Sequence, residues 1–305
     1  MATERRAREL TSVVVVAADS GPLLGACIES VLATAAPIEI LLVDNASADG
    51  QVDAVAAAHA QEPRLRVLRN ANNRGFGPAC NQAAAVAHGD VLVFLNPDCR
   101  VQPDTIAHLR AALADAHDGL IGATIRSPSG ELGRGVRRRD PLFTRLLASM
   151  TGFSRWESRW PSLQGIEIGA PPPATGLERV DAVSGACMAL TARVFDELDG
   201  FDEGYFLHFE DLDLCRRTRD AGYGVFVAGD ISIVHAQGSS SRHRRVFVAY
   251  HKHRGMWRYF RKFDPAYRST PLRAALWVAI WLHFAAMAPV YFVRSRITAL
   301  RTDPA

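Results

Sequence analysis

The stretch Val91-Leu92-Val93-Phe94-Leu95-Asn96-Pro97-Asp98 joins five consecutive apolar residues directly to a polar turn. A continuous run of this kind predicts a strand that is covered on both faces, as in a parallel sheet. Similar runs at 11–17, 38–43, 65–69 and 119–123 alternate with stretches of helical spacing. The alternation predicts an α/β fold with a mostly parallel sheet and helices on both faces.

Ligands of such sheets bind beyond the carboxyl ends of the strands, so the residues there are candidates for a site. Asp44 and Asn45 follow the strand at 38–43. Their side chains suit hydrogen bonds to a ribose or a base, and equally the capping of an ordinary polar turn. Arg74 and Gly75 precede the next helix. The glycine permits close backbone approach to a ligand and the arginine reaches a phosphate, although an ordinary helix start also fits.

Asp98 ends the buried strand that opens this section, and its neighbour Asn96 is polar as well. A carboxylate in this position can hold Mg²⁺ or Mn²⁺, which prefer oxygen ligands and share them with a diphosphate. A helix-capping role for Asp98 is an equal alternative on this evidence. His235 follows a strand-like run at 231–234. A single histidine is usually structural, but near a metal it becomes a candidate ligand.

The segment 200–214 is rich in acidic and aromatic residues and includes the pair Glu210-Asp211. Acidic residues at a helix N-terminus are stabilised by the helix dipole, which is one explanation. The other is a general base, a carboxylate that removes the proton from an attacking hydroxyl. Apolar neighbours favour this second role because they raise a carboxyl pKa.

Several classes of protein are disfavoured. No Gly-x-Gly-x-x-Gly or P-loop pattern is present, which argues against a Rossmann dehydrogenase and an ATPase. A net charge of +3 gives little support to nucleic-acid binding. Five scattered cysteines without a Cys-x-x-Cys pair argue against disulfides and structural zinc, and favour a reducing compartment. The apolar run at 13–18 follows arginines but is short, so it predicts a first strand and not a signal peptide.

Taken together, these segments resemble the inverting glycosyltransferase family 2, of fold type A, over residues 11 to about 262. The similarity is greatest to its bacterial rhamnosyltransferase branch. It is carried by VDNAS at 43–47, NNRGFGPACNQA at 72–83, FLNPDC at 94–99, SGACMALTARVFDELDGFDEGYFLHFEDLDLCRRTRDAGY at 184–223 and HKHRGMWRYFRKF at 251–263. The resemblance implies a glycosyltransferase A-type, Rossmann-like sheet.

The resemblance also implies a role for each matching position. Asp98 matches the last acid of the metal motif and His235 completes the metal site. Asp211 is the implied base and Glu210 supports it. The implied nucleotide-sugar contacts are Asp44, Asn45, Arg74, Gly75, Asn96, Ser184 and Gly185. Asn96 stands where many members have Asp, and a neutral amide weakens cation binding.

The implied function is transfer of a sugar from a nucleotide-diphosphate donor, with L-rhamnose from dTDP-rhamnose as the expected donor. The acceptor is a hydroxyl of a glycan or of a polyprenyl-diphosphate-linked glycan, in cell-surface polysaccharide synthesis with inversion and Mg²⁺ or Mn²⁺. A catalytically inactive nucleotide-sugar-binding protein on the same fold is the main alternative. A nucleotidyltransferase is disfavoured because Asp19-Ser20-Gly21-Pro22 lacks the basic residue of its glycine-rich loop.

The chain divides into a catalytic domain at 1–240 and a C-terminal helical extension at 241–305. Residues 126–178 are expected to form an insertion or flexible loop facing the acceptor. The extension mixes basic residues, Arg245 and Lys252 among them, with aromatic residues, which suits an anionic membrane interface, the diphosphate of a lipid-linked acceptor or a solvated helix face. It then becomes apolar over 274–293, which predicts a helix lying on, or dipping into, the inner leaflet. A full span or a buried helix are the alternatives. The expected location is cytoplasmic and peripheral at the inner membrane face, with no nucleic-acid partner.

Overall fold

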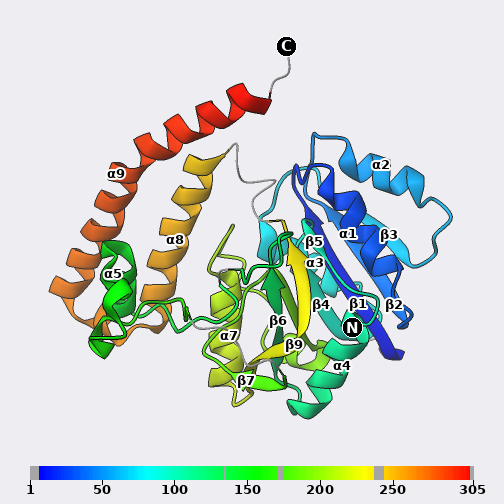
Figure 1. Cartoon of the computed structure of the whole chain (residues 1–305), viewed down its shortest axis with the longest axis horizontal. Helices are drawn as coiled ribbons and strands as arrows, with labels where there is room; N and C mark the ends of the chain where they lie inside the picture. The colour runs from blue at the N-terminus through cyan, green and yellow to red at the C-terminus, as the bar shows by residue number, and fades with distance from the viewer. Residues whose placement is uncertain (1–6, 134, 170–174, 237–243, 303–305) are drawn as a thin grey trace.

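The computed structural model describes residues 7–133, 135–169, 175–236 and 244–302, and Figure 1 shows their arrangement. One mixed sheet runs in the order β3-β2-β1-β4-β8-β6-β9-β5, and β7 pairs with β9 at its side. The strands are β1 (Ala7–Ala17), β2 (Ile38–Asp44), β3 (Leu65–Arg69), β4 (Gly89–Leu95), β5 (Cys99–Arg100), β6 (Leu120–Arg126), β7 (Leu177–Arg179), β8 (Cys187–Thr191) and β9 (Val225–His235). The predicted α/β fold is confirmed.

The parallel half of the sheet is β3-β2-β1-β4. The chain moves outward from β1 through β2 to β3 and then returns past β1 to β4. Crossovers between parallel strands are right-handed, so the helices of the outward and return connections cover opposite faces. This reversal between β1 and β4 is a topological switch point, the place where such sheets bind ligands. The valines and leucines of β1, β2 and β4 form the buried core there.

The other half of the sheet is partly antiparallel. β8 runs antiparallel to both β4 and β6. The sequence predicted one strand over 180–190, but only 187–191 enters this ladder, because Ser184 and Gly185 lie in a turn. Two short strands were predicted at 225–227 and 231–234, whereas the structure has the single strand β9 with a register shift.

The helices of the domain are α1 (Leu23–Leu32), α2 (Gln51–Ala58), α3 (Phe76–Ala84), α4 (Thr105–Asp115), α5 (Phe143–Thr151), α6 (Ala192–Glu197) and α7 (Glu210–Asp220). The bounds of α4 match the prediction at both ends. The predicted insertion at 126–178 is not merely a loop, since α5 and two 3₁₀ turns (Phe153–Trp156 and Pro161–Leu163) lie in it. All five cysteines are free and buried, as their spacing predicted.

The C-terminal extension is a pair of packed helices, α8 (Arg245–Phe263) and α9 (Thr270–Thr302). They stand beside the sheet domain, with α5 next to them (Figure 1). Leu276 and Ile280 of α9 are buried in the shared core. Most of the apolar stretch is not: only 11% of the most hydropathic window of Thr270–Ser295 is buried, and by length and composition this helix could cross a membrane.

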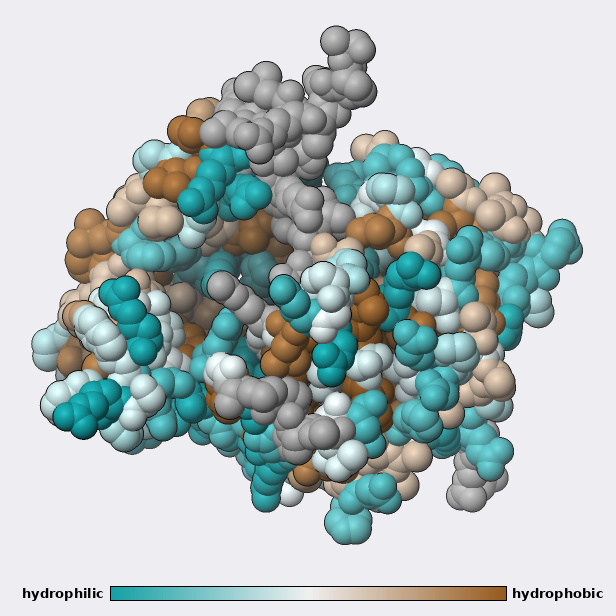
Figure 2. All heavy atoms as spheres, in the orientation of Figure 1, coloured by the Kyte–Doolittle hydropathy of each residue, from teal (hydrophilic) through white to brown (hydrophobic). Residues whose placement is uncertain are grey.

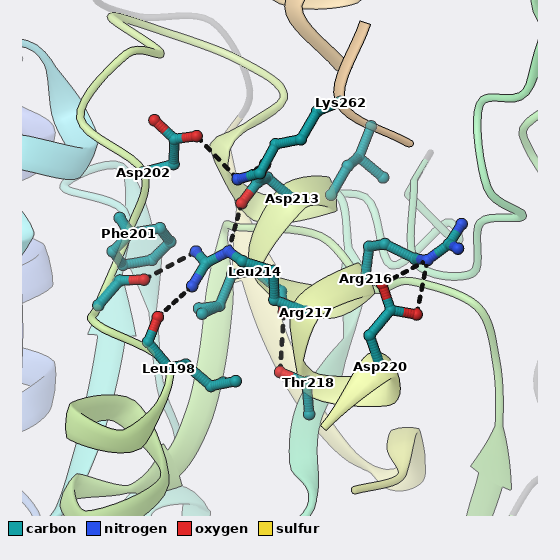
Figure 3. A network of polar contacts seen from close by, with 12 residues as sticks. Leu198, Phe201, Asp202, Asp213, Leu214, Arg216, Arg217, Thr218, Asp220 and Lys262 are labelled. Atoms are coloured by element: carbon teal, nitrogen blue, oxygen red, sulfur yellow. Dashed lines mark hydrogen bonds and ion pairs between the residues drawn. The ribbon is translucent and has the colours of Figure 1, made fainter. Parts of the chain in front are cut away.

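A network of buried charges fixes α8 to α7 (Figure 3). The carboxylate of Asp213, which has no exposed surface, accepts hydrogen bonds from Arg217 at 2.5 Å and from Lys262 of α8 at 2.7 Å. Lys262 also contacts Asp202 at 2.8 Å. Arg217 donates in addition to the backbone carbonyls of Leu198 and Gly200. The loop before α7, the helix itself and α8 are therefore held as one unit.

We expect Asp213→Ala to lower the free energy of unfolding by about 3 kcal/mol, because it leaves Arg217 without its counter-ion and Lys262 with Asp202 alone. Asp220→Ala is the matched control on the same helix. Asp220 is half exposed and pairs with Arg216 at 2.9 Å, so its loss is expected to cost less than about 1 kcal/mol. Urea denaturation of both variants measures the difference, and equal losses would contradict the structural role of Asp213.

Candidate active site

The pairing of β5 with β9 brings Asp98 and His235 together. Cys99 is aligned with His235 across this two-residue ladder, and the Ala236 N–H donates to the Asp98 carbonyl at 3.1 Å. The His235 Nε2 atom lies 3.0 Å from Oδ1 of Asp98. The Asp98 side chain is 7% exposed and that of His235 15%, so both groups are held in place with one open side.

The Asp98–His235 pair fits a divalent cation that is shared with a ligand. Cys99 Sγ belongs to the same cluster, in which all ligand atoms lie within 4.8 Å of one another. Burial, followed by the charge of Asp98, raises the Cys99 thiol pKa well above its usual value, so sulfur is an unfavourable ligand. One carboxylate and one imidazole remain. Imidazole suits Mn²⁺ better than Mg²⁺, and the remaining coordination positions suit phosphate oxygens and water.

Asn45 organises the loop at 70–75. Its amide nitrogen donates to Asn73 Oδ1 at 2.9 Å and to the Gly75 carbonyl at 3.0 Å. Its oxygen accepts from the Asn70 side chain at 3.1 Å and from the Arg74 N–H at 3.0 Å. These contacts use the full hydrogen-bonding capacity of the amide. The structure therefore supports a positioning role for Asn45, and a direct contact with the nucleotide requires exchange of one of these bonds.

Asp44, Arg74 and Gly75 have distinct positions. The carboxylate of Asp44 accepts from the Ser47 N–H at 2.9 Å and from Arg69 at 3.0 Å, so it closes the turn after β2. Arg74 is exposed. Gly75 adopts φ +96°, and a Cβ atom there would lie 2.7 Å from the carbonyl oxygen of Phe206. The loop before α3 thus touches the loop before α7, and only glycine fits at the contact.

Asp211 is ion-paired, which sequence analysis did not predict. Its Oδ2 accepts from Arg138 at 2.9 Å and from the Gly185 N–H at 3.1 Å, while Oδ1 accepts from the Leu212 N–H at 2.9 Å. A carboxylate offers about four lone-pair positions, so one acceptor position on Oδ1 stays free among the described residues. Ser184 bonds within the same turn, through the Ala186 N–H at 3.2 Å.

Arg138 reaches Asp211 from the insertion. The segment around it forms bridges with Glu167 and with Ala182, and the Arg138 N–H donates to the Ala182 carbonyl at 2.8 Å. The sequence placed Arg137-Arg138-Arg139 in a loop facing the acceptor, and the charge run was the only signal for a contact with the proposed base. The insertion therefore contributes a side chain to the site and does not only cover it.

Asp211 and Asp98 are connected through the turn before β8. Gly185 donates to Asp211, and the next residue, Ala186, accepts from the Asn96 N–H at 2.9 Å. Asn96 lies two residues from Asp98. A short chain of backbone contacts thus joins the two predicted parts of the site. Glu210, by contrast, is buried, and its Oε2 has no hydrogen-bond partner among the described residues.

Burial, and next the negative charge of Asp211, raise the pKa of Glu210 to about 8. Because the pKa of this carboxyl is higher in the folded protein than in the unfolded chain, its contribution to stability is greatest below the unfolded pKa. That contribution is lost as the pH rises toward 8. We therefore expect Glu210→Gln to be close to the unchanged protein in stability at pH 5 and more stable by roughly 2 kcal/mol at pH 8. Urea denaturation at both pH values, with the exposed Glu203→Gln as control, measures this. A constant difference would contradict the raised pKa.

One cavity of about 880 Å³ lies at the carboxyl ends of the parallel strands and extends to the C-terminal helices, where Figure 2 shows a recess. Five predicted site residues line it: Asn45, Gly75, Asn96, Asp98 and His235. The other six are not part of its wall in the described structure: Asp44, Arg74, Ser184, Gly185, Glu210 and Asp211. The predicted metal ligands therefore face the open space, while the proposed base is covered by its partners.

The cavity also has a wall from the C-terminal helices that the predicted site residues did not include, although the sequence indicated that the basic residues there suit an anionic membrane or a lipid-linked diphosphate. Arg245, Lys252 and Met256 of α8 line it, together with Met150 of α5 and Tyr291 of α9. The volume lies within the usual range of small-molecule and cofactor pockets. The signal in the sequence was the spacing of Arg245, Lys252 and Met256, which places them on one helix face.

Comparison with known proteins agrees with the fold. The profile of glycosyl transferase family 2 matches residues 12–167. N-acetylglucosaminyl-diphospho-decaprenol L-rhamnosyltransferase of Mycobacterium tuberculosis is 29% identical over 274 residues, 82% of this chain and 87% of the relative. These findings define a glycosyltransferase. Because the profile covers more than half of its 305 residues, the chain belongs to glycosyl transferase family 2.

Solved structures share the fold at low identity. The mannosyltransferase PcManGT of Pyrobaculum calidifontis, in complex with GDP-Man and Mn²⁺, superposes with a TM-score of 0.58 at 19% identity, covering 99% of this chain and 77% of that chain. A fragment of Staphylococcus aureus TarS with UDP-GlcNAc gives a TM-score of 0.54 at 14% identity, with 93% and 86% coverage. The mannosyltransferase therefore shares the fold of this chain.

Proposed function

We propose that this enzyme transfers L-rhamnose from dTDP-rhamnose to a hydroxyl of a polyprenyl-diphosphate-linked glycan, with inversion, in cell-surface polysaccharide synthesis. The observation that carries the proposal is the Asp98–His235 pair on the wall of a cavity that the C-terminal helices also line. The mycobacterial relative is named for a lipid-diphosphate acceptor and for rhamnose, which supports this choice of substrates. The mannosyltransferase neighbour was solved with a nucleotide sugar and Mn²⁺, which supports a cation.

In the proposed mechanism, Asp98 and His235 would hold Mn²⁺ or Mg²⁺, which would neutralise charge on the departing diphosphate. Asp211 accepts the proton of the acceptor hydroxyl at its free Oδ1 position as the new bond forms, a step that requires this covered carboxylate to become accessible from the cavity. Arg138 and the Gly185 N–H keep the other oxygen of this carboxylate oriented. Asn45 positions the loop beside the nucleotide, and Glu210 stays neutral and buried next to the base.

The test is a transfer assay with the purified protein and Mn²⁺. A panel of dTDP-, UDP- and GDP-sugars is offered with polyprenyl-diphospho-N-acetylglucosamine, and product formation is followed by mass spectrometry. We expect dTDP-rhamnose to be used fastest, and the anomeric configurations of donor and product to differ by NMR. Preference for another sugar would overturn the donor assignment, and absence of any transfer or hydrolysis would favour an inactive binding protein.

We also propose that the chain associates peripherally with the cytoplasmic face of the membrane through α9. Hydrophobic residues are visible on the surface over α9 (Figure 2). The exposed apolar side chains of this helix include Leu282 at 65% exposure and Phe292 and Val293 at 54% each. An exposed apolar face of this size on a helix beside many arginines is typical of a helix lying in the membrane interface. The acceptor in the proposed reaction is itself a membrane lipid.

We expect the double variant Leu282→Asp with Val293→Asp to reduce binding to anionic vesicles by at least about tenfold, since two exposed apolar side chains no longer insert into the bilayer and the new carboxylates are repelled by its charge. Val86→Asp is the matched control, because Val86 is a similarly exposed apolar residue on the sheet domain. Flotation on phosphatidylglycerol vesicles measures the effect. An equal loss in the control, or no loss in either variant, would contradict the assignment of α9.

A further inference from the structure

The wall of the cavity that α8 contributes combines cationic and apolar side chains. Its members on this helix are Arg245, Phe247, Val248, Ala249, Lys252, His253 and Met256. Most follow the three- and four-residue spacing of a single helix face. Arg245 and Lys252 are separated by seven residues, or about 10 Å along the helix axis, and both project from the face that lines the cavity. Two cations at this separation can contact one diphosphate.

Arg245 and Lys252 differ from two other cations near the cavity, Arg244 and Lys262, in forming no ion pair among the described residues. Arg244 pairs with Asp19 at 3.2 Å, and Lys262 pairs with Asp202 and Asp213. For Arg245 and Lys252, no ion pair or hydrogen bond occurs within the parts of the chain that the structure describes, and the Arg245 Nε atom is buried without a partner. A buried polar group without a partner is costly, which points to a ligand.

The electrostatic surroundings of Lys252 also favour an anion. Desolvation in the cavity, and then the positive charge of Arg138, lower the pKa of its ammonium group, although Glu167 acts in the opposite direction. An anionic ligand would relieve this repulsion. The second cation, Arg245, has the planar guanidinium that binds phosphate oxygens in pairs.

Beyond the two cations the cavity becomes apolar. Leu146 and Met150 of α5, Met256 of α8 and Tyr291 of α9 line this part. Methionine side chains adapt to flexible ligands, and an unbranched or isoprenoid chain is of that kind. The exposed apolar residues of α9 lie on the same helix as Tyr291. The cavity therefore offers apolar side chains as well as two cations to a lipid diphosphate.

We propose that Arg245 and Lys252 bind the diphosphate of a polyprenyl-diphosphate-linked acceptor, and that its first isoprene units lie against Met150, Met256 and Tyr291. This inference rests on the proposed function, since it names the acceptor side of the same cavity. The donor also carries a diphosphate. It is assigned to the sheet side, where Asp98 and His235 provide a cation site, and the α8 cations belong to a different wall.

The inference is tested by calorimetric binding of farnesyl diphosphate, a water-soluble polyprenyl diphosphate, to the full chain. Mn²⁺ and a saturating concentration of the nucleoside diphosphate that the protein binds most tightly occupy the donor site. We expect Arg245→Gln and Lys252→Gln each to weaken binding of farnesyl diphosphate by tenfold or more. Farnesol and inorganic pyrophosphate are expected to bind at least tenfold more weakly than farnesyl diphosphate to the unchanged protein.

Arg254→Gln is the matched control: Arg254 lies on the same helix, is exposed, and is not part of the cavity wall. It is expected to change binding less than twofold. If the Arg245 and Lys252 variants bound the nucleoside diphosphate as much more weakly as they bind farnesyl diphosphate, these cations would belong to the donor site. That result would overturn the inference. So would failure of the unchanged protein to bind farnesyl diphosphate, or binding of pyrophosphate with the same affinity. These readouts involve no turnover, so an inactive protein with the expected binding pattern would contradict only the proposed reaction.

Discussion

Asp211→Asn is expected to lower the kcat of sugar transfer by about 10²–10⁴-fold, the usual contribution of a general base, while nucleotide affinity changes little. Asparagine preserves the shape of the side chain but cannot accept the proton of the acceptor hydroxyl. The Asp211 carboxylate accepts hydrogen bonds from Arg138, Gly185 and Leu212, and its amide replacement loses at least one of them. Melting curves are therefore measured alongside the initial rates.

Asp220→Asn provides the control for Asp211→Asn, because Asp220 ends the same helix and is half exposed. We expect its kcat to stay within about twofold of the original. Binding of dTDP, measured by calorimetry for all three proteins, separates a lost base from a damaged donor site. Parallel loss of dTDP affinity and kcat in Asp211→Asn would remove Asp211 from the role of base.

Asp98→Asn and His235→Ala are each expected to raise the Mn²⁺ concentration needed for half-maximal transfer by roughly tenfold or more, since even indirect partners of a metal contribute that much. Treatment with EDTA is expected to stop transfer and added Mn²⁺ to restore it. Electron paramagnetic resonance measures free Mn²⁺ directly and gives the affinity without turnover. We expect the Mn²⁺ concentration for half-maximal transfer and the dissociation constant from electron paramagnetic resonance to rise in parallel.

Cys99→Ser is the control for the metal prediction, since Cys99 Sγ lies in the same cluster but donates to the Ala186 carbonyl at 3.5 Å. Its thiol pKa is raised far above the working pH, so we expect the Mn²⁺ affinity of Cys99→Ser to change less than threefold. A Mn²⁺ affinity that is unchanged in both Asp98→Asn and His235→Ala would reject the pair as the cation site.

The local parts of the fold were predictable from the sequence. The apolar runs of β1, β2 and β4 are continuous because these strands are covered on both faces, and their positions followed directly. The helix at 105–115 was also predicted with its correct ends. The strand predicted at 180–190 begins before the observed strand β8. The chain forms a turn first, and the ladder begins only at Cys187. Polarity and periodicity describe neighbours along the chain, and they contain little information on pairing.

The geometry of the site depends on distant pairings that a single sequence does not reveal. Asp98 and His235 are 137 positions apart by number, and a ladder of only two residues aligns them. The four hydrogen bonds of the Asn45 side-chain amide are made to residues 25–30 positions away in the sequence. Arg138 comes from a segment whose composition resembles a loop. Family resemblance supplied the candidates, and the structure shows which of them face the cavity.

The ion-paired helix α7 has a consequence for how this enzyme could change its substrate. Residues 211 and 213 lie in the same helical turn: the first points to Gly185 and the second to Lys262 of α8. Two residues of α7 thus set the spacing between the proposed proton acceptor and α8, the helix proposed to bind the lipid diphosphate. Substitutions farther along α8 and α9 can alter the accepted lipid length during evolution without disturbing the distance across which the proton moves.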